Sequence, residues 1–172
     1  MNSIRSWLVL DEAEKSLPYQ DEDGIWTVGI GHNMEANPIP LSVLAMIEPA
    51  APESRGIYPS SLDFIRSHGG LDGDEIDTLF NHDLNIVNQW LLPKFPGVTG
   101  ARLAALQNMG FNLGETRFAD FDTFIPLVQA GRWNDAANDL AHTLVYRELP
   151  ARYYRICKTL ITGEWPPVLE NF

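Results

Sequence analysis

The sequence DEAEKSLPYQDEDGIWTVGIGH, residues 11–32, changes its pattern part-way along. From Leu17 to Ile30 the apolar residues recur with a period of two, and the acidic, glycine-containing stretch Asp21–Gly24 interrupts them. Alternation on both sides of a turn signal predicts a β-hairpin.

The second strand of this hairpin has two different faces, because successive side chains point to opposite sides of a sheet. The apolar face carries Trp26, Val28 and Ile30. The opposite face carries Ile25, Thr27, Gly29 and Gly31. A face with a threonine and two glycines leaves the backbone open to close approach by something bulky. We therefore expect Thr27 to face outward into a cleft.

A helix is predicted before the hairpin, because apolar residues recur at helical spacing after Asn2 and Ser3, either of which can serve as its N-cap. We expect this helix over residues 3–14, with Glu12 in its final turn. After the hairpin, five prolines punctuate residues 33–71, which predicts short helices and loops around two apolar stretches, 41–47 and 61–66.

A long helix is predicted over residues 72–91, opened by a cap at Asp72 and ended by Pro93 and Pro96. Further helical patterns follow at 101–113, 122–130, 134–141, 143–147 and 151–161, the last closed by Gly163.

The expected fold class is α+β and predominantly helical, with a small N-terminal β-hairpin lobe and a helical C-terminal lobe joined by the long helix. The boundaries predicted within a single domain of residues 1–172 are 13–71 for the first lobe, 72–91 for the linking helix and 92–172 for the second lobe. Helix 3–14 is expected to pack at their junction.

Composition excludes several function classes. The formal net charge of −11 argues against a nucleic-acid partner, which needs a basic surface. Residues 1–100 hold 5 of the 12 basic and 15 of the 23 acidic residues, so the rest of the chain is the better candidate to meet an anionic polymer. The single cysteine permits no disulfide framework, and the four histidines lack metal-ligand spacing. The apolar run Ile4–Leu10 is too short for a signal sequence or a membrane span.

Two carboxylates and a hydroxyl carry the chemistry, in the spacing Glu12-x8-Asp21-x5-Thr27. Short connections must bring them close together, and glycoside cleavage needs one protonated carboxyl group to donate to the leaving oxygen and one ionised carboxylate. Glu12 lies near the negative end of a helix dipole, which suits the acid, while Asp21 lies in a polar turn, which suits the base.

The segment 11–32 resembles the opening signature of the phage-type lysozymes, the endolysins of glycoside hydrolase family 24. Later segments match the family in order: LFNHD (79–83), AALQNM (104–109), GET (114–116) and RWNDAA (132–137). The resemblance implies hydrolysis of the β-1,4 bond between N-acetylmuramic acid and N-acetylglucosamine in peptidoglycan. It further implies inversion, a monomer, no metal and no cofactor, and residence in the host cytoplasm before release to the cell wall.

The resemblance also implies roles for individual residues. Glu12 is expected to be the general acid, and Asp21 and Thr27 to activate the attacking water. His32 is expected to pair with Asp83, and Arg152 to approach Glu12. The residues expected to line the sugar cleft are Asn33, Phe111, Asn112 and Asp139.

This chain departs from the family pattern in its acidity, its long proline-rich 33–60 region, Val145 in place of an aromatic residue, and Asp139 in place of an asparagine. Two other functions stay open. One is a lytic transglycosylase, which forms an anhydro sugar and would not need Asp21 or Thr27. The other is a peptidoglycan-binding module without turnover.

Overall fold

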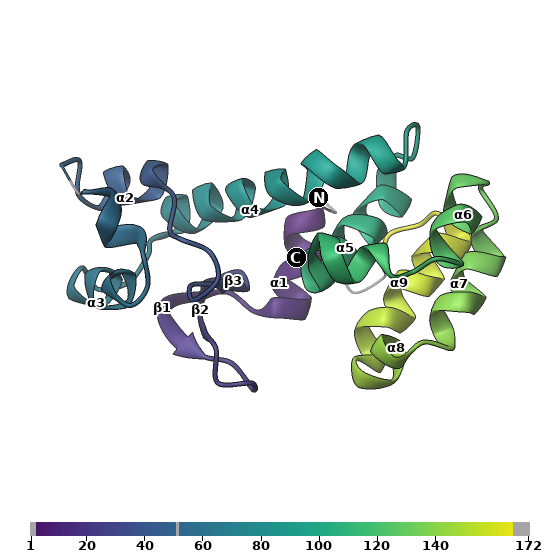
Figure 1. The fold of residues 1–172 in the computed structure, drawn as a ribbon, viewed down its shortest axis with the longest axis horizontal. Helices are drawn as coiled ribbons and strands as arrows, with labels where there is room; N and C mark the ends of the chain where they lie inside the picture. Colours follow the sequence, from purple (N-terminus) through teal and green to yellow (C-terminus); the bar gives the residue numbers. More distant parts are fainter. Residues whose placement is uncertain (1–2, 51, 167–172) are drawn as a thin grey trace. The chain divides into compact units, whose positions relative to one another are not determined.

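The computed structural model describes residues 3–50 and 52–166 and divides them into two compact units. The sheet unit comprises Leu8–Asp83, and the helical unit comprises the chain before Leu8 and after Asp83. The predicted α+β class is confirmed, since a small antiparallel sheet lies in the first unit and helices make up the second (Figure 1).

Helix α1 (Ile4–Glu12) begins where the sequence predicted, because Ser3 Oγ accepts a hydrogen bond from Ser6 N at 3.2 Å. It ends two residues earlier than predicted. Ala13 adopts a positive φ of 63°, which turns the chain out of the helix and into the sheet.

The sheet contains β1 (Lys15–Gln20), β2 (Trp26–Gly29) and β3 (His32–Asn33) in that order, with antiparallel pairing throughout. The predicted hairpin is therefore confirmed as β1–β2. In its register Tyr19 lies opposite Thr27, and Thr27 lies opposite Asn33. These three residues form a row across the sheet and point to the same side of it.

The second face of β2 is less open than its glycines predicted. Thr27 is only 5% exposed. A Cβ added to Gly29 would meet Leu79 of α4 at 3.4 Å, an ordinary contact, and it is the positive φ of 64° that favours glycine there. On the apolar face Val28 and Ile30 are buried as predicted, whereas Trp26 is partly exposed beneath the guanidinium of Arg66, 4.4 Å from its ring centre.

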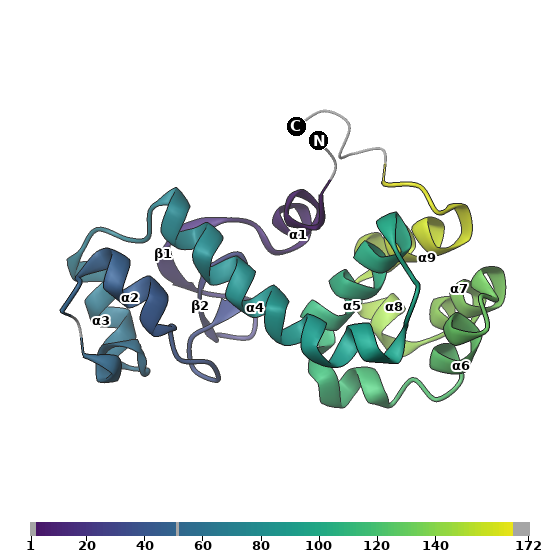
Figure 2. The same cartoon turned by 90° about the horizontal axis from the view of Figure 1, so that it is seen from above.

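The proline-rich region folds as the short elements α2 (Leu41–Ile47), η1 (Glu53–Gly56) and α3 (Ser60–Ser67). Both helices predicted here are confirmed to within a few residues. Figure 2 shows α2 and α3 side by side within the sheet unit.

Helix α4 (Gly73–Lys94) has residues in both units. Asp72 and Glu75 cap it reciprocally: Glu75 N donates to Asp72 Oδ1 at 2.9 Å, and Asp72 N donates to Glu75 Oε2 at 2.8 Å. The prediction that Pro93 ends the helix is wrong. Proline removes one donor, but in the last turn the helix continues around it, since Phe95 N still donates to Leu91 O at 3.2 Å.

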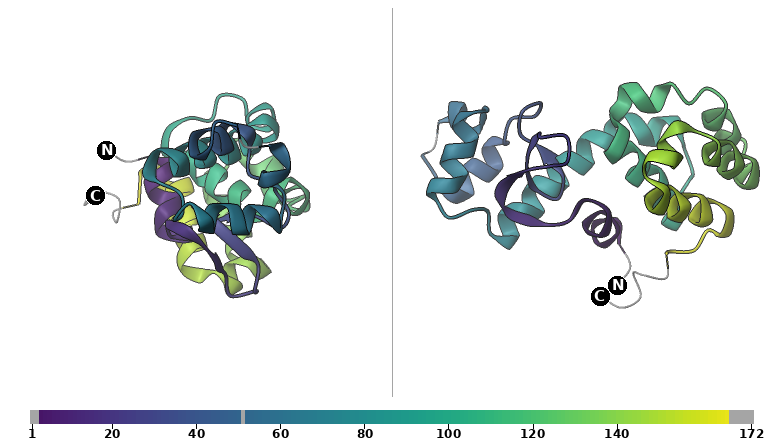
Figure 3. Two further views of the ribbon diagram at one scale, coloured as in Figure 1. Left: turned by 90° about the vertical axis from the view of Figure 1, so that its left-hand side faces the viewer. Right: turned by 90° about the horizontal axis from the view of Figure 1, so that it is seen from below.

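The helical unit adds α5 (Gly100–Ala119), α6 (Phe124–Gln129), α7 (Trp133–Ala141), α8 (Leu144–Glu148) and α9 (Pro150–Thr162). Helix α5 continues six residues beyond its predicted end, across a break at Gly114 (φ 69°, ψ 170°). Gly163 closes α9 in the left-handed conformation, as predicted. Figure 3 shows α7, in green, beside α9, in yellow.

Candidate active site

Glu12 is the last residue of α1, and its side chain lies against the backbone between β2 and β3. A Cβ added to Gly31 would come within 3.1 Å of both Cγ and Oε2 of Glu12. Gly31 also has a positive φ of 69°, which favours glycine at this position. The end of the helix and the β2–β3 turn thus hold the Glu12 carboxyl group between them.

Asp21 lies in the exposed hairpin turn and is held by the backbone of that turn. Its Oδ1 accepts hydrogen bonds from Asp23 N at 3.0 Å and Ile25 N at 2.9 Å. Two donors to one carboxylate oxygen fix the plane of the group. The geometry therefore matches the polar environment expected for Asp21.

Thr27 lies in the middle of the cross-strand row, between Tyr19 and Asn33. Its hydroxyl donates to the carbonyl oxygen of Ile25, the residue just before β2, at 3.2 Å. Because that bond uses the hydroxyl hydrogen, the lone pairs of the Thr27 oxygen remain to accept a hydrogen bond from a water or a substrate.

Tyr19 joins this site, although the sequence analysis gave it no role. Burial raises the pKa of the Tyr19 phenol above its ordinary value, and the charges of Glu12 and Asp21 raise it further. The charges of both carboxylates therefore act on the phenol. The signal was present in the strand period, since Tyr19 and Asp21 are two residues apart and so lie on the same side of the hairpin.

His32 and Asp83 lie together within the sheet unit. His32 Nδ1 is 2.8 Å from Asp83 Oδ2, and its Nε2 is 3.0 Å from the carbonyl oxygen of Asn37. Both ring nitrogens of His32 therefore have a hydrogen-bond partner within this unit. The pair ties β3 to α4.

Asn33 uses its carboxamide oxygen inside the protein, where it accepts hydrogen bonds from the backbone nitrogens of Glu35 and Ala36, both at 3.0 Å. These bonds shape the turn after β3 and leave the amide NH₂ group as the part of Asn33 that can donate to a sugar.

Four further predicted site residues belong to the helical unit. Arg152 is buried and donates two hydrogen bonds to Asn108, from Nε to Oδ1 at 2.8 Å and from Nη2 to the carbonyl oxygen at 3.0 Å. Its approach to Glu12 stays a prediction. Asn112 Oδ1 accepts from Tyr153 at 2.9 Å, and Phe111 is half-buried on α5.

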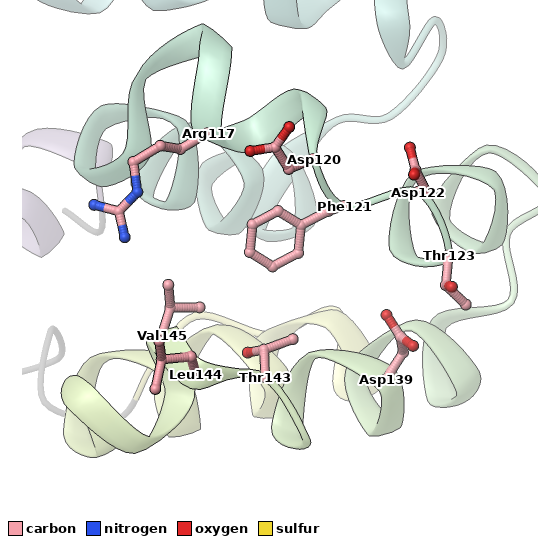
Figure 4. A pocket seen from close by; sticks show the side chains of 9 residues that line it. All are labelled: Arg117, Asp120, Phe121, Asp122, Thr123, Asp139, Thr143, Leu144 and Val145. Carbon is pink, nitrogen blue, oxygen red and sulfur yellow. The ribbon is translucent and has the colours of Figure 1, made fainter.

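Asp139 lines a pocket of about 380 Å³ that we call the aspartate pocket. The side chains that line it, shown in Figure 4, are Arg117, Asp120, Phe121, Asp122, Thr123, Asp139, Thr143, Leu144 and Val145. The Phe121 ring projects between the end of α5 and the α7–α8 segment (Figure 4). Phe111 and Asn112 are not among its lining residues. The sequence analysis missed Phe121, since an aromatic residue after a helix end also fits core packing.

Among residues 3–50 and 52–166, no three His, Cys, Asp or Glu side chains are placed to hold a metal ion. No helix within these ranges is long and apolar enough to cross a membrane.

The family model for phage lysozyme matches residues 11–147. The chain belongs to the phage lysozyme family. This span contains Glu12, Asp21 and Thr27 but ends before Arg152. Membership places the chain among lysozyme-type peptidoglycan hydrolases.

Two of the curated relatives of this chain are named as T4-type lysozymes. The chain is 25% and 24% identical to probable T4-type lysozymes 1 and 2 of Dictyostelium discoideum, over 95% of this chain and 96% of each relative. It is 27% identical to the pre-baseplate central spike protein Gp5 of Enterobacteria phage T4, over 94% of this chain and 28% of that protein.

Proposed function

We propose that this phage-lysozyme relative hydrolyses the β-1,4 bond between N-acetylmuramic acid and N-acetylglucosamine with inversion at the anomeric carbon. The observation that carries the proposal is that Glu12 lies against Gly31 beside β2 and that Asp21 begins the turn of the β1–β2 hairpin, so one compact unit holds both carboxyl groups. Two carboxyl groups in one site are what glycoside hydrolysis requires.

Glu12 is the proton donor in this proposal. Its side chain is held between the end of α1 and the Gly31 backbone, so it has little freedom to turn away from a leaving oxygen. A fixed donor lowers the entropic cost of reaching the transition state.

Asp21 and Thr27 bind and orient the attacking water in this proposal. Two backbone donors hold Asp21 Oδ1, and the second oxygen of Asp21 accepts a water proton. The Thr27 hydroxyl donates to Ile25 O, so its oxygen accepts a second hydrogen from the same water. Two acceptors orient the water's lone pair toward the anomeric carbon.

Tyr19 supports this division of roles. With its pKa raised, the phenol stays protonated at neutral pH and can donate to a carboxylate or to a sugar hydroxyl. It would not compete with Asp21 for the water proton.

Substrate contacts from the helical unit are part of the proposal. Asp139 and Phe121 line the aspartate pocket, which offers three carboxylates and one aromatic ring to a polar substrate group. Asn33, Phe111 and Asn112 are proposed to contact the sugars directly. The protein is proposed to act as a monomer and to reach the wall from the host cytoplasm.

The test is product analysis after digestion of purified peptidoglycan in ¹⁸O-labelled water. Hydrolysis predicts a reducing end that contains one ¹⁸O atom, and early NMR spectra should show the α-anomer first, because inversion converts a β-bond. An anhydro end without label would overturn the proposal in favour of a transglycosylase. Binding without any new end would leave only a binding module.

The control pair for this test is Asp21→Asn and Glu22→Gln, two adjacent acidic residues of the hairpin. Hydrolysis by the proposed route requires the first substitution to abolish labelled product and the second to leave its yield unchanged. A transglycosylase would tolerate both.

A further inference from the structure

A second concave surface lies in the helical unit, between α7 and α9, which Figure 3 shows side by side. Its volume of about 550 Å³ falls in the range of ligand pockets, roughly 300–1,000 Å³. We call it the tyrosine groove, after Tyr146 and Tyr154 in its lining. It shares no residue with the aspartate pocket.

The lining of the tyrosine groove suits a carbohydrate. Tyr154 is 57% exposed, so its ring contributes little to the core and presents an aromatic surface to solvent. Asn134 and Asn138, one helical turn apart on α7, offer amide donors and carbonyl acceptors to hydroxyl or acetamido groups. The lining also includes the apolar side chains of Ala137, Ala141 and Ile161, which can pack on the nonpolar face of a sugar ring.

Charge distinguishes this groove from the aspartate pocket. Lys158 is the one charged residue in its described lining, whereas the aspartate pocket has three carboxylates and one guanidinium. In a chain with a net charge of −11, a lining with a cation and no carboxylate is a surface that an acidic ligand can approach. The floor is also uncharged, since burial raises the pKa of the Cys157 thiol to about 11.

We propose that the tyrosine groove binds a second stretch of peptidoglycan, recognised as an N-acetylated amino-sugar glycan with acidic substituents. Tyr154 stacks on a sugar ring, Asn134 and Asn138 bond to its acetamido group, and Lys158 meets a carboxylate. The identity of this ligand rests on the proposed function. A groove outside the sheet unit would retain the enzyme on an insoluble polymer between cleavage events.

The test uses the Glu12→Gln chain, so that binding is measured without turnover. Co-sedimentation with purified sacculi compares this chain with a form that also carries Tyr154→Ala and Lys158→Gln. The expected result is an increase of about tenfold in the apparent Kd. The matched control carries Leu92→Ala and Lys94→Gln on α4, one exposed apolar residue and one cation, and should bind as before.

NMR locates the ligand directly. Titration with an acidic disaccharide-peptide should shift the side-chain amide signals of Asn134 and Asn138, and a neutral N-acetylglucosamine tetramer should shift them less. The proposal is overturned if these signals do not move, if both ligands act equally, or if sacculus binding survives the double substitution.

These outcomes are separate from those of the proposed function. With Glu12 restored, the Tyr154→Ala, Lys158→Gln form should keep the wild-type kcat on a short soluble glycan and lose activity only on sacculi. If the wild-type chain makes no product at all, hydrolysis fails while the NMR titration still decides the groove.

Discussion

The sheet unit and the helical unit hold their polar side chains in different ways. In the sheet unit the backbone does so: turn nitrogens fix Asp21, and the Gly31 backbone lies against Glu12. In the helical unit a buried side chain does so, since the Arg152 guanidinium donates hydrogen bonds to Asn108. We infer that substitutions of Glu12 and Asp21 change the reaction and that substitution of Arg152 changes stability.

The largest expected effect is on catalysis. Glu12→Gln removes the proton donor and should lower kcat about a thousandfold, since general acids contribute roughly 10²–10⁴ in rate. The melting temperature should stay within a few degrees of wild type. Turbidity clearance of cell walls and circular dichroism measure the two quantities, and more than a tenth of wild-type kcat would contradict the role of Glu12.

Next in size is a stability effect in the helical unit. Arg152→Met removes the two hydrogen bonds that the buried guanidinium donates to Asn108, which should lower the free energy of unfolding by about 3 kcal/mol. Urea denaturation measures this, with the exposed Arg117→Met as control. Full stability combined with a large loss of kcat would place Arg152 in the reaction instead and break the contrast between the units.

A smaller effect tests how the backbone holds Glu12. Gly31→Ala imposes a positive φ on alanine, at a cost of about 1–2 kcal/mol, and pushes on the Glu12 side chain. Gly69→Ala has the same backbone cost, at φ 85°, but its Cβ would meet nothing within 4 Å. Both variants should lose similar stability, and only Gly31→Ala should lose about tenfold in kcat. Equal activities would show that contact with Gly31 does not position Glu12.

The smallest effect is a pH dependence in the helical unit. The pKa of Cys157 is raised from 9.0 to about 11, so above pH 9 the unfolded chain loses the thiol proton before the folded chain does. The stability that the protonated thiol contributes is present below pH 9 and is lost as the pH rises toward 11. Urea denaturation should show the advantage of wild type over Cys157→Ala shrinking by about 1 kcal/mol from pH 8 to pH 10. A difference in unfolding free energy between wild type and Cys157→Ala that stays constant from pH 8 to pH 10 would contradict the raised pKa.

The same contrast explains how much the sequence could predict. Glu12, Asp21 and Thr27 lie within 16 residues, and short connections left few ways to place them apart, so their grouping followed from spacing. The burial of Thr27 did not, because burial depends on how distant parts of the chain pack around the strand.

In the helical unit the helices were predictable from their periodicity, but the pockets were not. Phe121 and Asp139 share the aspartate pocket only because α5, α7 and α8 fold together. The continuation of α4 past Pro93 was missed for a local reason: near a helix end the lost donor costs one hydrogen bond and the remaining bonds close the turn.

The row formed by Tyr19, Thr27 and Asn33 makes the length of the Asp21–Ile25 turn critical. Inserting or deleting one residue in this turn would shift the β1–β2 pairing by one position. Every side chain of β2 would then point to the other face of the sheet. Thr27 would then leave the side of the sheet that carries Tyr19 and Asn33, although all the residues would still be present. Loss of activity in this enzyme can therefore arise from a change in loop length that leaves every functional residue intact.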